Sequence, residues 1–113
     1  MKRSLHLTAD LLRRYSRRGN FHSDVDAAAT IGYQRLVAQG MQAAAPAYGL
    51  LLDEWGDDFL MSGTIELKFV GIVVDDETVD AEIKLDPDSR SATINVVVGD
   101  RTVVVGHATR GEP

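Results

Sequence analysis

The residues around His22 have the types and spacing that could move a proton. Histidine is the side chain that changes charge near neutral pH, so it can act as a general acid or base. Asp24 is the nearest carboxylate and Asn20 the nearest amide, whereas the other two histidines fall in strand-like segments. The pattern predicts His22 as the acid–base group, with Asp24 as its candidate partner. Asn20 could position a water molecule.

Composition narrows the chemistry that such a site could perform. The 113 residues include no cysteine, which excludes thiolate nucleophiles, disulfides and cysteine-bound metals. The histidines do not have the spacing of metal ligands, so we expect no metal. We also expect no cofactor. Twelve Lys and Arg against 17 Asp and Glu leave a formal net charge of −5, which argues against general nucleic-acid binding.

Basic residues gather near the N-terminus, before His22. Six of the twelve fall within the first 24 positions: Lys2, Arg3, Arg13, Arg14, Arg17 and Arg18. Because Arg17 and Arg18 closely precede His22, they could meet an anionic ligand through bidentate contacts. The alternative is that these arginines are solvated charges at the end of a helix.

Two short helices are expected on either side of His22. The apolar spacing of residues 11–15 predicts the first, and a run of alanines at 27–29 predicts the second. Ser23 or Asp24 can cap the second helix, because short polar side chains accept hydrogen bonds from the first free N–H groups. His22 is therefore expected in a loop between helices, where functional residues are common.

One long helix is expected from Val37 to about Trp55. Its apolar residues recur at helical spacing: Met41, Ala44, Ala45, Tyr48, Leu51, Leu52 and Trp55. Pro46 lies inside this run and removes the hydrogen bond to the carbonyl of Gln42. We therefore expect a kink there, or an irregular first part of the helix.

After the helix, the apolar period changes from 3.6 to 2. Strands are expected over residues 4–8, 59–70, 72–85, 91–98 and 101–109, with a tight hairpin at Gly99-Asp100. One strand, then helices, then an antiparallel meander is the pattern of an α+β fold in which a sheet wraps around one long central helix. No linker or repeat interrupts residues 1–113, which we interpret as one domain.

Two short motifs carry a resemblance to a known family. They are Asn20-Phe21-His22-Ser23-Asp24 and Val37-Ala38-Gln39-Gly40-Met41. They resemble motifs of the MaoC-like acyl dehydratases and (R)-specific enoyl-CoA hydratases, and the 18 positions from His22 to Gly40 resemble the family's own spacing. The likeness continues through Phe69, Val70 and residues 75–79. It implies a hot-dog fold.

The resemblance also implies roles for His22 and Gly40. In the family, a histidine and an aspartate hold a water and shuttle its proton during addition to a 2-enoyl thioester, and a backbone N–H holds the thioester oxygen. A helix N-terminus suits that second role, since it offers unpaired donors and the positive end of the helix dipole. Glycine at position 40 lets a ligand approach closely, although tight packing against the sheet would also explain it.

The chain departs from the family pattern at the catalytic carboxylate. That position falls on Arg17 if His22 is aligned and on Arg18 if Asn20 is aligned. Gln39 stands where histidine is common, which keeps hydrogen bonding but loses titration. Three functions stay open: a hydro-lyase acting on an acyl thioester or a related small enolisable carbonyl compound, a non-catalytic partner subunit of a heteromeric dehydratase, and an isomerase or cyclase in specialised biosynthesis.

The small size of the chain and the lack of a membrane-spanning or secretion segment lead to expectations about its oligomeric state and its location. Two sheets could join edge to edge in a homodimer, or in a heteromer with a related hot-dog chain, and so cover their exposed strand edges. The sequence lacks a run of about 20 apolar residues, the length that crosses a membrane, and its first residues lack a secretion signal. We therefore expect a cytoplasmic protein.

Overall fold

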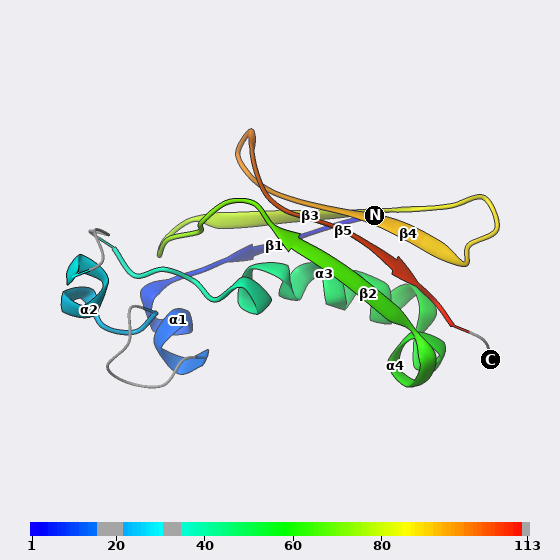
Figure 1. Cartoon of the computed structure of the whole chain (residues 1–113), viewed down its shortest axis with the longest axis horizontal. Coiled ribbons are helices and arrows are strands. Elements are labelled where there is room, and N and C mark those ends of the chain that lie inside the picture. The colour runs from blue at the N-terminus through cyan, green and yellow to red at the C-terminus, as the bar shows by residue number, and fades with distance from the viewer. Residues whose placement is uncertain (16–21, 31–34, 112–113) are drawn as a thin grey trace.

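A computed structural model describes residues 1–15, 22–30 and 35–111. Within these residues, five strands form one antiparallel sheet in the order β1-β3-β4-β5-β2. The strands are β1 (Lys2–His6), β2 (Thr64–Phe69), β3 (Thr78–Leu85), β4 (Ser91–Val98) and β5 (Arg101–Thr109). The helices are α1 (Ala9–Tyr15), α2 (Val25–Thr30), α3 (Gly40–Trp55) and α4 (Asp57–Ser62). Figure 1 shows α3 lying along one face of the sheet, with α1 and α2 at one end and α4 at the other.

The long helix α3 provides most of the contact with the sheet. The predicted apolar face is only partly right. Ala44, Leu51 and Trp55 are buried as predicted, whereas Met41, Ala45 and Leu52 are exposed. The buried face is completed instead by Gln42, Ala43, Pro46, Ala47 and Leu50. The helix runs unbroken across Pro46, which is itself buried. The predicted start at Val37 is wrong by three residues, because Val37 forms a β-bridge with Val74 and the Ala38 N–H donates to the carbonyl of Val73 at 2.8 Å.

The last two strands confirm the prediction residue for residue. β4 alternates between buried and more exposed positions, and Ala92, Ile94 and Val96 pack toward the core. The hairpin closes at Val98 and Arg101, and Gly99 takes a positive φ of 61°. Glycine adopts that conformation without steric cost, which is why the dipeptide marked the turn.

The predicted strand over residues 59–70 is half wrong. Residues 57–62 form α4, and β2 starts only at Thr64. Gly56, at φ 55°, ends α3, and the acidic pair after it suits the positive end of a new helix. Phe59 then packs on Trp55, with ring centroids 5.9 Å apart. Burial of this ring, not strand alternation, explains the apolar residue there.

The predicted strand over residues 72–85 begins too early. β3 starts at Thr78, and residues 70–77 are an irregular crossing apart from the bridge at Val74. Asp76 has φ 70°, a turn conformation that aspartate tolerates better than most side chains. Its N–H donates to the carbonyl of Leu7 at 2.7 Å, so the crossing is tied to the end of β1.

The N-terminal elements are close to their predicted positions. β1 covers residues 2–6 instead of 4–8, and α1 follows with Thr8 as its cap, since the Leu11 N–H donates to Thr8 Oγ1 at 3.2 Å. No helix among the described residues is long and apolar enough to cross a membrane. The predicted α+β arrangement, a sheet packed on one long helix, is confirmed.

Candidate active site

A pocket of about 510 Å³ opens at the start of α3. Three parts of the chain form its walls: residues 37–41 with Ala43, Phe69 with residues 71–73, and Val104 of β5. His22 lines the same pocket, so the structure brings together His22, Gln39 and Gly40 from the predicted site residues.

His22 is held in a defined orientation. Its Nδ1 lies 2.6 Å from the carbonyl oxygen of Val37. Because a carbonyl can only accept, Nδ1 carries the proton, and the lone pair of the neutral ring is on Nε2. The Val37 bridge to Val74 fixes this carbonyl in turn. The ring is partly buried and lies at the pocket, as an acid–base group requires.

Asp24 caps α2. Its Oδ1 accepts hydrogen bonds from the N–H groups of Asp26 at 2.9 Å and Ala27 at 3.3 Å. This confirms Asp24 as one of the two predicted capping residues. The cap holds the turn that carries His22. A catalytic role for Asp24 stays a prediction.

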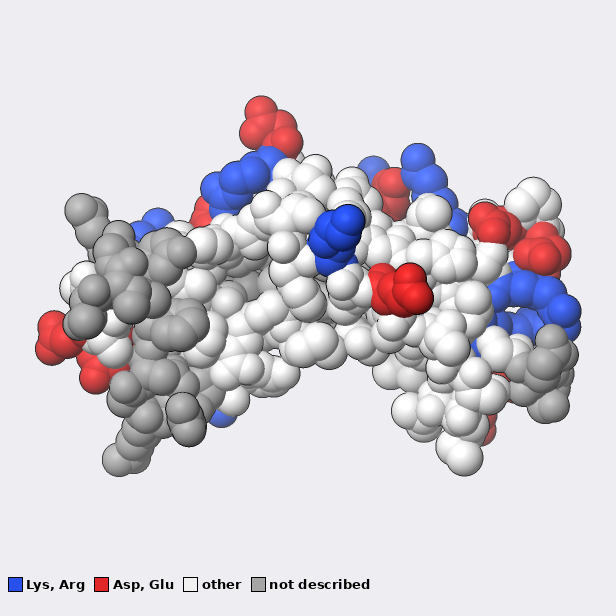
Figure 2. Space-filling model, viewed as in Figure 1, with Lys and Arg blue, Asp and Glu red and all other residues white. Residues whose placement is uncertain are grey.

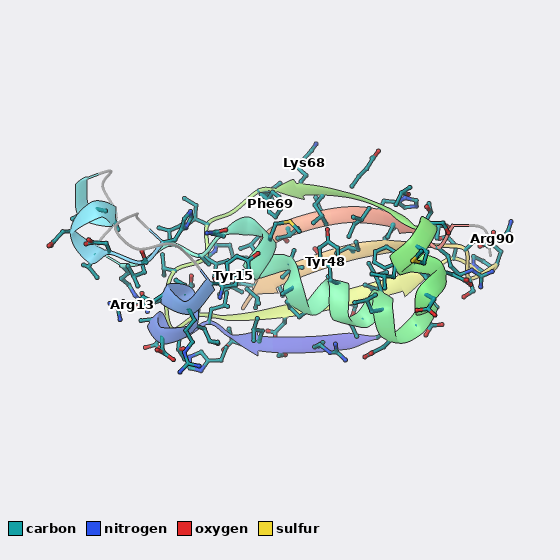
Figure 3. All side chains as sticks on the ribbon, turned by 90° about the horizontal axis from the view of Figure 1, so that it is seen from below. Arg13, Tyr15, Tyr48, Lys68, Phe69 and Arg90 are labelled. Carbon is teal, nitrogen blue, oxygen red and sulfur yellow. The ribbon has the colours of Figure 1, made fainter. Side chains whose placement is uncertain are left out.

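Gly40 is the first residue of α3, and its N–H makes no hydrogen bond to another described residue. A Cβ built on Gly40 would lie 2.8 Å from Cε1 of Phe69, closer than two carbon atoms normally approach. Figure 3 shows Phe69 beside the first turn of α3. Glycine therefore leaves room for the Phe69 ring where it lies, and within the described residues the Gly40 N–H is an unpaired donor at the pocket.

Gln39 precedes Gly40 in the N-cap position, and its side chain does not cap the helix. The residue lines the pocket, as predicted for a substrate-binding group. Three other predicted site residues, Arg17, Arg18 and Asn20, lie outside the described residues. Among the described residues, no group of three His, Asp or Glu side chains could hold a metal ion.

Apolar side chains form the rest of the pocket. Val73 and Val104 are almost fully buried at its floor, whereas Met41, Phe69 and Ile72 are between 44% and 49% exposed at its rim. An apolar wall next to one histidine and one free N–H suits a ligand with a hydrocarbon part and a carbonyl group. Met41 lies next to Gly40 on α3, whereas the other wall residues come from the end of β2, from the crossing at residues 70–77 and from β5. The sequence analysis did not assign these residues to the site, because they are distant in sequence from His22 and Gly40.

Ion pairs hold the crossing that forms one wall. Arg101 Nη2 donates to the carbonyl of Ile72 at 3.0 Å and to both carboxylate oxygens of Glu77, at 3.0 and 3.1 Å. Glu77 Oε1 also accepts from the Val74 N–H at 2.9 Å. The β4–β5 hairpin thereby fastens the pocket wall through one guanidinium group.

Comparison with known proteins agrees with this arrangement. A family model described as the MaoC like domain matches residues 2–106, nearly the whole chain. The protein belongs to the MaoC-like family. The resemblance identified from the motifs around His22 and Gly40 is thus confirmed, and with it membership of a hydratase and dehydratase family.

Solved structures of hydratases and of a dehydratase share the fold. The (R)-hydratase from A. caviae involved in PHA biosynthesis is 24% identical, with a TM-score of 0.72 over 96% of this chain and 89% of that one. The R-hydratase PhaJ1 from Pseudomonas aeruginosa is 18% identical, with a TM-score of 0.73 over 99% of this chain and 80% of that one. A chain of the HadBC (3R-hydroxyacyl-ACP dehydratase) complex from Mycobacterium tuberculosis is 19% identical, with a TM-score of 0.70 over 95% of this chain and 89% of that one. No curated protein sequence matched the chain. The predicted hot-dog fold is confirmed.

Proposed function

We propose that this MaoC-like chain is a hydratase or dehydratase that acts on an acyl thioester, bound to CoA or to a carrier, or on a related small enolisable carbonyl compound. One observation carries the proposal: His22 and the unpaired N–H of Gly40 line the same apolar pocket. A proton-transfer group, an oxyanion donor and a hydrocarbon-binding wall are the parts that such a reaction needs.

In the hydration direction, His22 Nε2 accepts a proton from water as the water oxygen bonds to C3 of the 2-enoyl group. The electron pair of the C2–C3 double bond moves toward the carbonyl, and the Gly40 N–H stabilises the negative charge on its oxygen. His22 then returns the proton to C2. Dehydration follows the same steps in reverse. The Val37 carbonyl keeps Nδ1 protonated, so Nε2 is the nitrogen that works.

The remaining predicted site residues have supporting roles in this proposal. Asp24 holds the turn of His22 and is its candidate catalytic partner, and Asn20 positions the water. Gln39 contacts the substrate beside Gly40. Arg17 and Arg18, in place of the family's aspartate, meet an anionic group such as a phosphate of CoA or of a carrier's pantetheine arm.

The variant His22→Ala tests the proposal. We expect kcat/KM for hydration of a short 2-enoyl-CoA to fall by on the order of 100-fold or more, because general acid–base catalysis is lost. His107→Ala is the matched control, since His107 is exposed on β5 and is not among the pocket residues. Full activity of His22→Ala, with circular dichroism showing an intact fold, would contradict the proposal.

A second candidate function is that of a non-catalytic subunit in a heteromeric dehydratase. The HadBC complex, whose solved structure shares this fold, supports it, as does the arginine at the family's aspartate position. The two candidates are separable by purifying the chain alone. Turnover by the chain without any partner supports the enzyme and excludes the subunit.

We also propose that the active form is a dimer in which two sheets join edge to edge. The antiparallel sheet has two outer strands, β1 and β2, whose outer backbone groups face no other strand of the described chain. Such edges pair readily with another chain.

A further inference from the structure

The short helix α1 lies between the two halves of the proposed site. Figures 1 and 3 both show it between α2, which follows the turn of His22, and the start of α3, which carries the Gly40 N–H. Among the residues of α1, all of which the structure describes, only Leu12 is buried. A helix this short depends on its neighbours to hold it, so the polar contacts of α1 help to fix its position.

Surface charges do not tie α1 to α3 in the described part of the chain. Arg14 pairs with Asp10 at 3.0 Å, but both residues lie within α1 and are exposed. On the face that Figure 2 shows, uncharged atoms cover the first turns of α3. Hydrogen bonds are therefore the polar contacts that join α1 to its neighbours.

Gln42 makes the hydrogen bond between α3 and α1. Its side chain is buried, and its Nε2 donates to the carbonyl of Leu11 at 3.0 Å. The backbone N–H of Gln42 donates to the carbonyl of Gln39 at 3.0 Å, and Gln39 lines the pocket. Gln42 also lies only two residues after Gly40, in the first turn of α3. It therefore connects α1 to the turn that carries the oxyanion donor.

Arg13 makes the corresponding hydrogen bond between α1 and the turn of His22. Its Nε donates to the carbonyl of Ser23, the residue after His22, at 3.3 Å. Figure 3 shows Arg13 on the side of α1 toward α2. Two hydrogen bonds thus connect the start of α3 to the turn of His22 by way of α1: Gln42 to Leu11, and Arg13 to Ser23.

The amide of Gln42 is not the group that stability alone would favour. Its Oε1 is buried and accepts no hydrogen bond from the described residues. An unpaired buried acceptor lowers the stability of the fold, whereas methionine fills a similar space without one. A buried polar group can instead fix one arrangement of the elements around it. Position, and not stability, is then what the Gln42 amide contributes.

We propose that Gln42 is a positioning residue of the site, which holds the turn of His22 at a fixed place relative to the Gly40 N–H by way of α1. Gln42 is not among the pocket residues, so it acts through these two groups and not on the substrate. A displacement of about 1 Å between groups that act on one substrate can lower the rate of a reaction on the order of 100-fold. This inference rests on the proposed function, in which His22 and the Gly40 N–H act together.

The variant Gln42→Met separates positioning from stability, because it removes both the hydrogen bond to Leu11 and the unpaired oxygen. We expect kcat for hydration of a short 2-enoyl-CoA to fall about tenfold or more, while KM changes less than about twofold because the pocket wall is intact. The midpoint of thermal unfolding should equal or exceed that of the wild type. Trp55→Phe is the matched control at the other end of α3, since Trp55 Nε1 donates to the carbonyl of Ser89 at 3.1 Å. This control should lower the midpoint and leave kcat unchanged.

The NMR signal of the His22 ring reports the same connection without any turnover. In protein with isotope-labelled histidine, this signal is assigned by its loss in His22→Ala. We expect Gln42→Met to shift the His22 signal and to leave that of His107, on β5, unchanged. Arg13→Met should also shift the His22 signal, and adding it to Gln42→Met should change the signal little further, because both hydrogen bonds belong to one connection.

The outcomes separate this inference from the proposed reaction. An unchanged kcat or an unshifted His22 signal in Gln42→Met overturns the positioning role and leaves the proposed function standing. A Gln42→Met chain that does not fold, or that loses as much stability as Trp55→Phe, makes Gln42 a structural residue and overturns the positioning role as well. If the wild type turns over no acyl thioester, the proposed function fails, and the His22 signal alone decides the positioning.

Discussion

Gly40 is the residue at which one added methyl group probes the site most directly. In Gly40→Ala, the Cβ would meet the Phe69 ring at 2.8 Å, so the ring or the first turn of α3 must shift. Because the donor N–H moves with that turn, we expect kcat/KM to fall on the order of 10- to 100-fold, while the ring, being half exposed, can move at little cost in stability. Steady-state kinetics and thermal unfolding check both parts.

The same residue offers a matched rescue. Phe69→Ala removes the ring that the new methyl group would meet, so Gly40→Ala should be less harmful when added to Phe69→Ala than when added to the wild type. Equal losses in both backgrounds would show that the ring is not the cause. Unchanged activity of Gly40→Ala alone would contradict the role of this N–H.

Among the secondary-structure elements, the crossing at residues 70–77 is the one whose position the site depends on. Arg101→Ala removes the hydrogen bonds to Ile72 and Glu77, and Arg101 is half exposed, so we expect a stability loss of only about 0.5–1.5 kcal/mol. The looser pocket wall should raise KM several-fold. Lys84→Ala, which breaks an exposed pair with Glu82, is the control. If both variants behave alike in urea denaturation and kinetics, the crossing does not depend on Arg101.

For the molecule as a whole, stability depends on the packing of α3 against the sheet. Leu51→Ala leaves a cavity at a fully buried position, and we expect it to lower the free energy of unfolding by about 2–5 kcal/mol. Leu60→Ala, on α4 at 67% exposure, should cost less than about 1 kcal/mol. Urea denaturation at one fixed protein concentration compares them, because dimerisation would make stability concentration-dependent. If Leu51→Ala and Leu60→Ala lowered the free energy of unfolding equally, the packing of α3 against the sheet would not be the main source of stability.

Local patterns in the sequence determined the elements whose neighbours along the chain suffice to specify them. The spacing of apolar residues predicted α3, the alternation of residues predicted β4 and β5 without error, and Gly99 predicted their hairpin. The resemblance of the motifs around His22 and Gly40 to motifs of the MaoC-like family identified two residues that line one pocket. The apolar spacing, the strand alternation and the turn glycine are each local patterns along the chain. The motifs around His22 and Gly40 are short sequences that can be recognised without the structure.

Only the tertiary structure decided where α3 starts and what encloses the site. Val37 is not part of α3, because it forms a β-bridge with Val74. Phe69 and Val104 line the pocket from β2 and β5, two strands that are distant in sequence and pair with each other. Residues 57–62 became helical because Phe59 packs on Trp55, a contact that strand periodicity does not encode. Such pairings depend on residues that are distant in sequence and are brought together only when the sheet closes over α3, so no local pattern predicts them.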